Sequence, residues 1–470
     1  MIAMQASVVA RATGGKLVAG SRRALATSVA IDSREVRPGA AFIAFPGERV
    51  DGHAFAQEAL SRGARVLVLT RDDPEAAAVV EADPRHELAL VRVDDATAAV
   101  QALAMRHREH LTCPVIGVTG SSGKTTTKDL LRAVLATRLS VVATEGNRNN
   151  EIGVPLTLLE AGPATGAVVL EMAMRGHGQI ARLCEIGRPT VGLVTNVGQT
   201  HIELLGSEQA IASAKAELVR AVPAAGRVFL NGDDEWSRMM EDVAEAPATY
   251  YGTAEGVDVR ARDVETDPDG RPSFTLDTSS GSVAVALAFP GRHNAYNAAA
   301  AAAVGLHLGI TLEEIGRGLS EARPSSMRME VFESAGGVTV INDAYNANPT
   351  AMRAALRTLA DVESGGRRVA VLGDMAELGS LSELAHFGLG EYAASLPIDR
   401  LVVVGEGAGR IADGAVRAGM AETSIVRCAT SDEAAEAVGE LLLPGDVVLL
   451  KASRIMGLER VVEGIINPHV

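Results

Sequence analysis

A glycine-rich loop is the part of this sequence whose residue types and spacing point most directly to chemistry. The loop follows a short apolar segment, Pro114–Val118, and runs into a segment in which leucine and valine recur at helical spacing. Its residues are Thr119, Gly120, Ser121, Ser122, Gly123, Lys124, Thr125 and Thr126. Backbone amides of such a loop bind phosphate oxygens, a lysine reaches the outer phosphates, and a threonine hydroxyl ligates Mg²⁺. The loop has the shorter T-G-x-x-G-K-T spacing, and it predicts a nucleoside triphosphate site with Lys124 on phosphate and Thr125 on the metal.

Two further side chains are expected at the same edge of a sheet. Glu171 directly follows the apolar segment Ala167–Leu170, and His201 follows the next one, Val191–Thr195, after a short polar loop. Open α/β sheets bind ligands at the carboxyl ends of their strands, and Mg²⁺ prefers oxygen ligands. Glu171 is therefore our first candidate for a metal ligand, and His201 is a second functional candidate at this edge.

Lysine is rare in this chain: among 44 lysines and arginines, lysine occurs only at positions 16, 124, 128, 215 and 451. Where arginine is the default cation, a lysine indicates a need for a compact ammonium or a modifiable amine. Lys215 lies in an expected helix, Ser207–Ala221. It is either a surface lysine paired with Glu208 or Glu217, or an amine that is carbamylated into an anionic oxygen ligand, which an arginine could not become.

Polar residues at further places suggest binding surfaces. Asn294 and Asn297 lie three residues apart, so both amides can face one way and suit the donor and acceptor edge of an adenine; helix capping is the alternative. In the last third of the chain, three strand-like segments each end in a polar run, at 342–349, 373–379 and 451–454. These runs supply carboxylates, amides and cations. Three of them at one sheet edge predict a binding face.

The elements that must position these residues alternate between strands and helices, which indicates an α/β fold with mostly parallel sheets. We expect three domains, at 1–93, 94–322 and 323–470. The expected strands are Ser28–Asp32, Ala40–Phe45 and Arg65–Thr70 in the first domain, Pro114–Val118, Ala167–Leu170, Val191–Thr195 and Arg227–Leu230 in the second, and Val338–Ile341, Arg368–Leu372, Arg400–Val404 and Val447–Leu450 in the third. The turn-rich stretch Asp263–Ser282 predicts an antiparallel excursion, and the third domain is expected to be Rossmann-like.

Composition excludes several classes of protein. The chain has 470 residues, a net charge of −15 and 47% apolar residues, so it can form a core and lacks the basic surface of a nucleic-acid binder. Its longest apolar stretch, Ala298–Leu306, is too short to span a membrane, and its first residues lack the basic start of a secretory signal. We therefore expect a cytoplasmic protein without membrane insertion. Cys113, Cys184 and Cys428 fit neither a metal site nor a disulfide framework and are expected to be inert thiols.

Together these motifs resemble the Mur ligase family, and the resemblance covers nearly the whole chain. Its most specific residues are the segments 343–349 (Asp-Ala-Tyr-Asn-Ala-Asn-Pro) and 372–379 (Leu-Gly-Asp-Met-Ala-Glu-Leu-Gly). The resemblance implies an ATP- and Mg²⁺-dependent ligase that acts through an acyl phosphate, with a UDP-binding N-terminal domain, a P-loop central domain and a Rossmann-like C-terminal domain. These segments favour addition of D-alanyl-D-alanine to UDP-N-acetylmuramoyl-tripeptide, because Thr350 stands where a diaminopimelate-adding or lysine-adding relative would have an arginine.

The resemblance also implies roles for individual residues. The catalytic residues would be Lys124, Glu171, His201, Lys215 and Arg328, and the metal ligands Thr125, Glu171, His201 and carbamylated Lys215. ATP would be bound by loop residues 119–126 and by Asn294, Asn297, Arg328 and Asp343. The substrates would be bound by Ser33, Arg34, Gly47, Asp51, His53, Asn147, Asn149, Asn150, Tyr345, Asn346, Asn348, Ser453 and Arg454. Arg454 is our choice for the dipeptide carboxylate, and Ala452 and Leu458 depart from the glycine and methionine expected beside it.

Two other functions stay open at this point. One is a ligase that adds a different amino acid, including one similar to folylpolyglutamate synthase. The other is an ATP-binding regulatory or scaffold protein that shows no substrate-stimulated hydrolysis. For the ligase, Asp343 and Arg328 must reach the P-loop, so we expect the third domain to close about a hinge near Arg323-Pro324. We expect the chain to act as a monomer.

Overall fold

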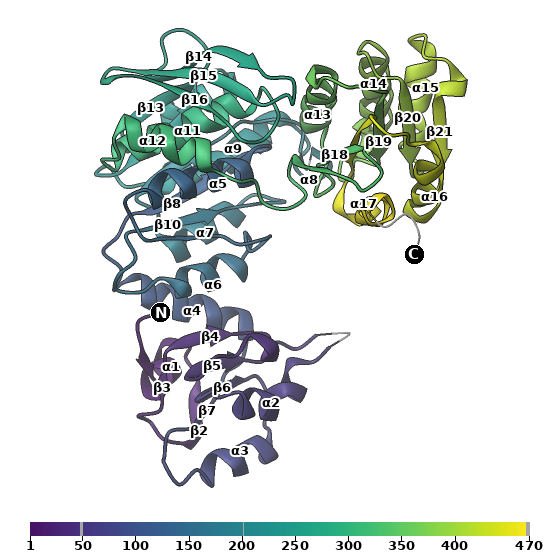
Figure 1. The fold of residues 1–470 in the computed structure, drawn as a ribbon. Coiled ribbons are helices and arrows are strands. Elements are labelled where there is room, and N and C mark those ends of the chain that lie inside the picture. Colours follow the sequence, from purple (N-terminus) through teal and green to yellow (C-terminus); the bar gives the residue numbers. More distant parts are fainter. Residues whose placement is uncertain (48–49, 201, 467–470) are drawn as a thin grey trace.

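The computed structural model describes residues 1–47, 50–200 and 202–466, which form three α/β domains, each built on its own sheet (Figure 1). The N-terminal and central domains are stacked, and the C-terminal domain lies to one side of the central domain. Within the described part of the chain, no helix combines the length and the apolar composition needed to cross a membrane.

The N-terminal domain has a five-stranded sheet in the order β2-β7-β6-β5-β4, parallel except for the β2–β7 pair. Its strands are β2 (Lys16–Gly20), β4 (Ser28–Ala30), β5 (Ala40–Ile43), β6 (Val66–Leu69) and β7 (Ala89–Arg92), with the short pair β1 (Met4–Gln5) and β3 (Leu25–Ala26) beside them. Its helices are α1 (Ala6–Ala12), α2 (Ala56–Ser61) and α3 (Pro74–Glu81). The valine-rich and leucine-rich strands are buried on both faces, as parallel strands covered by helices are.

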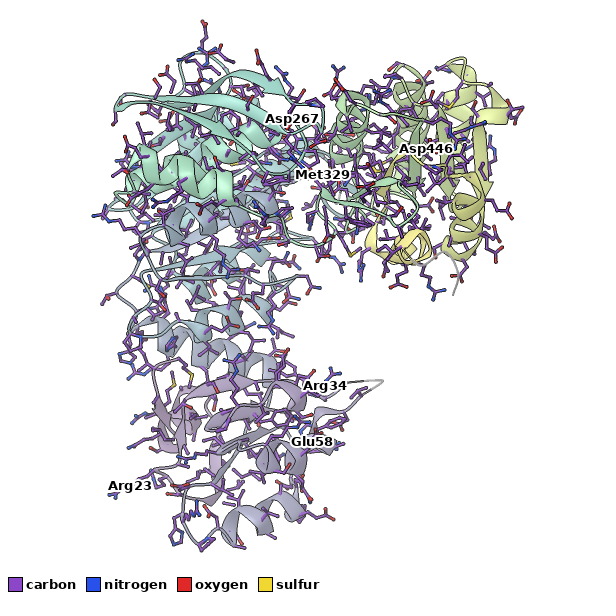
Figure 2. All side chains as sticks on the ribbon, viewed as in Figure 1. Arg23, Arg34, Glu58, Asp267, Met329 and Asp446 are labelled. Carbon is purple, nitrogen blue, oxygen red and sulfur yellow. The ribbon has the colours of Figure 1, made fainter. Side chains whose placement is uncertain are left out.

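The central domain has a nine-stranded sheet in the order β16-β15-β14-β13-β12-β11-β8-β10-β9. Its strands are β8 (Val115–Thr119), β9 (Val141–Ala143), β10 (Ala167–Glu171), β11 (Val191–Val194), β12 (Arg227–Asn231), β13 (Ala248–Gly252), β14 (Val259–Thr266), β15 (Pro272–Thr278) and β16 (Gly281–Ala286). Its helices are α4 (Ala96–Arg108), α5 (Lys124–Ala136), α6 (Gly153–Glu160), α7 (Gln179–Gly187), α8 (Ile202–Leu205), α9 (Glu208–Ala221), α10 (Glu235–Met239), α11 (Asn294–His307) and α12 (Leu312–Glu321). Strands β14 to β16 pair antiparallel, which confirms the predicted excursion. The turn of this excursion, marked by Asp267, points toward the C-terminal domain (Figure 2).

The C-terminal domain has a six-stranded sheet in the order β17-β18-β22-β19-β20-β21, parallel except for the edge strand β17. Its strands are β17 (Glu330–Glu333), β18 (Thr339–Asn342), β19 (Arg368–Gly373), β20 (Arg400–Val404), β21 (Ile425–Cys428) and β22 (Val447–Lys451). Its helices are α13 (Pro349–Asp361), α14 (Ser382–Ala394), α15 (Gly409–Arg417), α16 (Ser431–Leu441) and α17 (Glu459–Ile466). This is the expected Rossmann-like arrangement, and every strand predicted from the sequence is present with its ends within two residues of the prediction.

The hydrophobic cores divide the molecule differently from the sheets. One buried cluster runs without a break from N-terminal strands, through Leu103 in α4, to central-domain residues such as Leu170 in β10. The clusters of the C-terminal domain contain residues of that domain alone. The N-terminal and central domains are therefore packed on one another through a shared core.

An alanine-rich helix holds the glycine-rich loop in place. The run Ala298–Ala303 in α11 is at most 2% exposed, and a Cβ at Gly305 would lie 2.6 Å from Val134 in α5. Small side chains let α11 approach α5 closely, as tight helix packing requires. Since α5 begins at Lys124, this packing fixes the end of α5 that follows the glycine-rich loop. The apolar stretch Ala298–Leu306 is thus part of a packed helix.

Candidate active site

The glycine-rich loop joins β8 to α5 with backbone angles that only glycine adopts easily. Gly120 has a φ of +149°, and a Cβ there would lie 1.8 Å from Thr195 Oγ1. Gly123 has a φ of +79° and immediately precedes α5, and a Cβ there would lie 2.7 Å from Asn297 Oδ1. Both glycines are thus required by conformation and by space.

Residues that follow β11 brace this loop. Ser122 N donates to Asn196 Oδ1 at 2.9 Å, and Asn196 Nδ2 and Thr195 Oγ1 both donate to Ser122 O, at 3.1 and 2.6 Å. Ser121 N donates to Asn196 O at 2.9 Å. Sequence reasoning missed Asn196. The signal that could have found it is its position directly after a strand at the carboxyl edge of the sheet.

Lys124 and Thr125 lie at the start of α5. Lys124 Nζ donates to Gly120 O at 2.7 Å, folded back over its own loop. Loss of hydration lowers the pKa of Lys124, the charge of Glu171 opposes this, and Arg328 of the C-terminal domain lowers it further. Thr125 is buried and Thr126 half-buried. Charged groups of the central and C-terminal domains, Glu171 and Arg328, thus both act on Lys124.

Glu171, the last residue of β10, has one buried carboxylate oxygen without a hydrogen-bond partner among the described residues. Asn149 Nδ2 donates to its Oε1 at 2.8 Å, whereas its buried Oε2 has no hydrogen-bond partner among the described residues. A buried carboxylate oxygen without a partner is costly unless a ligand or ion satisfies it. His201, the other predicted ligand at this edge, lies outside the described residues. In the described ranges no three His, Cys, Asp or Glu side chains gather into a metal cluster.

Lys215 in α9 is buried, with 2% of its surface exposed. The alternative of a surface lysine paired with Glu217 is wrong, because the Glu217 carboxylate instead accepts from Gly178 N and Ala181 N. Burial lowers the pKa of Lys215 well below its usual value, and the nearby charge of Lys124 lowers it further. The folded environment therefore favours the neutral form of this amine over its charged form.

The two asparagines of α11 face one another rather than an open surface. Asn297 Nδ2 donates to Asn294 Oδ1 at 2.9 Å, and Asn294 Nδ2 donates to Pro290 O at 2.8 Å. Their neighbours His293 and Tyr296 line a pocket of about 350 Å³ that α13 of the C-terminal domain closes. Burial lowers the pKa of His293 to about 4, so its imidazole is neutral. The sequence analysis did not single out this pair of rings.

The polar strand ends of the C-terminal domain lie together, as predicted. Lys451 Nζ is 2.5 Å from Asp343 Oδ2 and donates to Asn346 O at 3.0 Å. The Arg328 guanidinium lies 4.0 Å from the centre of the Tyr345 ring. Ser453 Oγ accepts from Ala376 N at 2.9 Å, which joins two of the strand ends. Arg454 is half-exposed and pairs with Glu459 at 3.2 Å.

Asn348 connects this rim to the glycine-rich loop. Its Oδ1 accepts from Ala351 N at 2.9 Å and so caps α13, while its Nδ2 donates to Ser122 Oγ at 3.0 Å. The carboxyl edges of the central and C-terminal sheets therefore meet at the loop.

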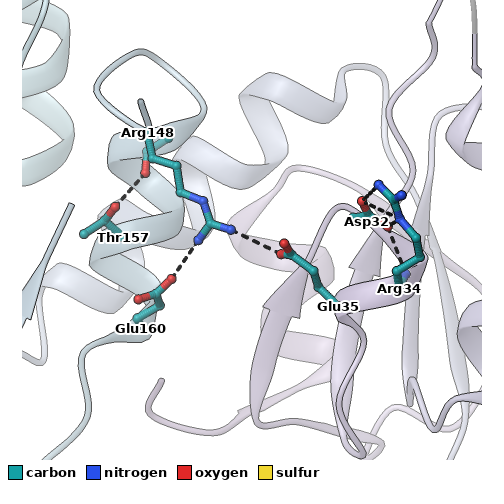
Figure 3. A network of polar contacts seen from close by, with 7 residues as sticks. Asp32, Arg34, Glu35, Arg148, Thr157 and Glu160 are labelled. Atoms are coloured by element: carbon teal, nitrogen blue, oxygen red, sulfur yellow. Dashed lines mark hydrogen bonds and ion pairs between the residues drawn. The ribbon is translucent and has the colours of Figure 1, made fainter. Parts of the chain in front are cut away.

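The predicted UDP-binding residues lie together at the carboxyl edge of the N-terminal sheet. Arg34 lies shortly after β4, and its side chain is 81% exposed. It forms an ion pair with Asp32 (Figure 3). His53 Nδ1 is 2.7 Å from Asp51 Oδ1, and its Nε2 accepts from Thr70 N at 3.1 Å. Two further predicted residues complete this edge. Ser33 donates to Glu58, and a Cβ at Gly47 would lie 2.5 Å from Val50 O.

A loop of the central domain faces this edge. Arg148 pairs with Glu160 in the central domain and with Glu35 in the N-terminal domain (Figure 3). The flanking Asn147 is exposed, and Asn150 Oδ1 accepts from the backbone N–H of Gly153, the first residue of α6, at 2.9 Å. The loop of residues 147–150 thus contacts the N-terminal domain through Arg148 and Glu171 through Asn149.

The fold and the site define an ATP-dependent ligase, with a phosphate-binding loop in the middle domain and a second sheet edge against it. Family models match the chain as "Mur ligase family, catalytic domain" over residues 26–108, "Mur ligase middle domain" over 118–305 and "Mur ligase, glutamate ligase domain" over 327–454. The chain belongs to the Mur ligase family.

Named relatives are similar over the full length. The UDP-N-acetylmuramoyl-tripeptide--D-alanyl-D-alanine ligase of Mycobacterium tuberculosis is 40% identical over 99% of this chain and 98% of its own. That of Bacillus subtilis is 36% identical over 93% of each. Among solved structures, MurF from Acinetobacter baumannii has a TM-score of 0.85 at 32% identity over 99% of both chains. MurF ligase from Thermotoga maritima in complex with ADP has a TM-score of 0.76 at 31% identity, covering 93% of this chain and 96% of its own.

Proposed function

We propose that this chain is the ATP-dependent ligase that joins D-alanyl-D-alanine to UDP-N-acetylmuramoyl-tripeptide in peptidoglycan synthesis. The relatives that carry this name and match this chain over at least 93% of its length support the substrates. The observation that carries the reaction type is the contact of Asn348 with Ser122, because it sets a second substrate-binding rim against a phosphate-binding loop. A ligase must bring an acid, a phosphoryl donor and an amine to one point.

In the proposed reaction, the tripeptide's terminal carboxylate attacks the γ-phosphorus of ATP, and the bond to ADP breaks. The neutral amine of the dipeptide then attacks the acyl phosphate carbon, inorganic phosphate leaves, and the nitrogen loses a proton. Charge grows on phosphoryl and tetrahedral oxygens, so Lys124 and the loop amides would stabilise it, and no enzyme nucleophile is required. Arg328 would add a second cation from the C-terminal domain.

The residues at the loop fit a Mg²⁺ ion. Mg²⁺ is usually held by one or two carboxylates together with substrate phosphates, and Glu171 has the unpartnered oxygen described above. Thr125 and Glu171 would hold it, with His201 as the further proposed ligand. When bound, the ion neutralises phosphate charge.

We further propose that Lys215 is carbamylated. A neutral amine adds to carbon dioxide, forming a nitrogen–carbon bond and releasing one proton. The lowered pKa of Lys215 favours that neutral form. Lys215→Ala should lower kcat at least tenfold, with partial recovery on addition of short carboxylic acids. Carbon-13 bicarbonate should label the wild type. The matched control is Lys16→Ala, an exposed lysine of β2; equal labelling and activity in Lys215→Ala would contradict the carbamate.

ADP release with UDP-N-acetylmuramoyl-tripeptide tests the substrates. We expect release to depend on D-alanyl-D-alanine and not on diaminopimelate or glutamate. Release that depends on either of those amines would identify a different ligase, and ATP binding without stimulated release would identify a regulatory protein.

The remaining assignments rest on the same proposal. We propose that the chain acts as a monomer in the cytoplasm, where nucleotide substrates are available. We propose domain limits at 1–93, 94–322 and 323–470, with UDP bound at the N-terminal edge and the muramoyl peptide along Asn147, Asn149 and Asn150. Tyr345, Asn346, Ser453 and Arg454 would hold the dipeptide, while Asn294, Asn297 and Asp343 would position the nucleoside.

A further inference from the structure

Lys128 is a buried lysine to which the proposed reaction gives no role. It lies in α5, one turn after Lys124, and its side chain is 3% exposed. Its ammonium is 2.8 Å from Asp129 Oδ1 and donates to Thr144 O at 2.8 Å. An ammonium is costly to bury unless it is paired and hydrogen-bonded, so both partners are needed to keep it there.

The other oxygen of Asp129 binds the linker between the central and C-terminal domains. Asp129 Oδ2 accepts from Ser325 N at 2.9 Å and from Ser325 Oγ at 2.7 Å. Ser325 follows Arg323-Pro324, the predicted hinge, and stands between α12 and β17. Hydrogen bonds to a charged, largely buried acceptor are among the stronger ones in proteins. The linker is thus fastened to the helix that begins at the phosphate loop.

The same pair is connected through Thr144 to Glu171, the last residue of β10. Thr144, whose carbonyl accepts from Lys128, offers its Oγ1 to Glu171 N at 3.0 Å. In the other direction along the chain, Arg328 lies three residues after Ser325, and its guanidinium is 4.0 Å from the centre of the Tyr345 ring at the C-terminal sheet edge. The buried Lys128–Asp129 pair is therefore connected to Glu171 in the central domain and to the linker that carries Arg328.

We propose that Asp129, paired with Lys128, is a positioning residue that anchors the linker at Ser325 and so docks the C-terminal domain against the phosphate loop. The inference rests on the proposed ligase function. It adds that the contact between Asp129 and Ser325, which lies outside the substrate-binding residues, stabilises the docked arrangement of the domains.

Ser325→Ala tests this anchor, because it removes the hydroxyl donor and leaves the Lys128–Asp129 pair intact. We expect kcat to fall about tenfold with little change in KM for the UDP substrate, since one hydrogen bond to a charged group is lost. We also expect the ligand-free variant to show a larger radius of gyration by small-angle scattering. Ser325→Thr keeps the hydroxyl and should restore both values.

The matched control is Ser326→Ala, one residue along, whose hydroxyl donates to Glu330 within the C-terminal domain at 3.1 Å. It should behave as wild type in both measurements. If Ser325→Ala also matches wild type, or loses activity without a change in scattering, the anchor is wrong. If wild type itself shows no dipeptide-dependent ADP release, the proposed function fails, and the scattering comparison still decides whether Ser325 docks the domain.

Discussion

At the scale of single residues, we expect His107 to make the stability of the folded chain depend on pH. It is fully buried in α4, with Nε2 2.8 Å from Ala161 O and an unpartnered Nδ1 within the described chain. Burial lowers its pKa from 6.5 to about 4. The unfolded chain therefore takes up a proton at a pH where the folded chain does not, and stability falls as the pH drops from the unfolded pKa toward the folded one.

Replacing His107 by Gln should remove part of this pH dependence. Between about pH 7 and about pH 5, the wild type should lose roughly 2 kcal/mol of unfolding free energy through this group, and the variant should not. Urea unfolding followed by circular dichroism measures the difference. His110→Gln, an exposed histidine just after the same helix, is the control and should keep the wild-type slope. An unchanged slope in His107→Gln would show that the group titrates normally.

At the scale of elements, the strand–loop–helix unit depends on space at Gly120. In Gly120→Ala the new methyl group would overlap Thr195 Oγ1, and alanine disfavours the positive φ of this position. The loop must then open, so ATP binding measured by calorimetry should weaken at least tenfold. Gly176→Ala, where a Cβ would meet nothing within 4 Å, is the control. Wild-type affinity in Gly120→Ala would mean that the loop is not the phosphate site.

How much of the site could be predicted from sequence depends on whether its parts are local. The phosphate loop and the strand ends at Glu171 and Asp343 were predictable, because the loop's residues are contiguous and the strands' apolar runs end where polar residues begin. The contact of Asn348 with Ser122 and the bracing by Asn196 were not, since they depend on how separate domains and neighbouring strands pack. The hydrogen bond between Asn297 and Asn294 was not predictable either: their spacing indicated a shared face, but only the structure shows that the two amides bond to each other.

At the scale of the whole molecule, the shared core predicts how the chain unfolds. Because one hydrophobic cluster spans the N-terminal and central domains, calorimetry should show two thermal transitions and not three. Leu103→Ala should destabilise the joint unit alone, lowering its unfolding free energy by about 2–5 kcal/mol and with it the temperature of its transition. Leu401→Ala, at an equally buried position in the C-terminal sheet, should lower the other. Three separate transitions, or a shift of both by either variant, would contradict the shared core.

This continuous core also bears on which substrates can be accepted. With two of the three lobes fused by packing, the span from the N-terminal sheet edge to the phosphate loop is fixed and cannot stretch to suit a shorter or longer peptide. Only the third lobe is left to move. With the substrates placed as proposed, the rigid pair would discriminate peptides by length, and the third lobe would choose the incoming amine.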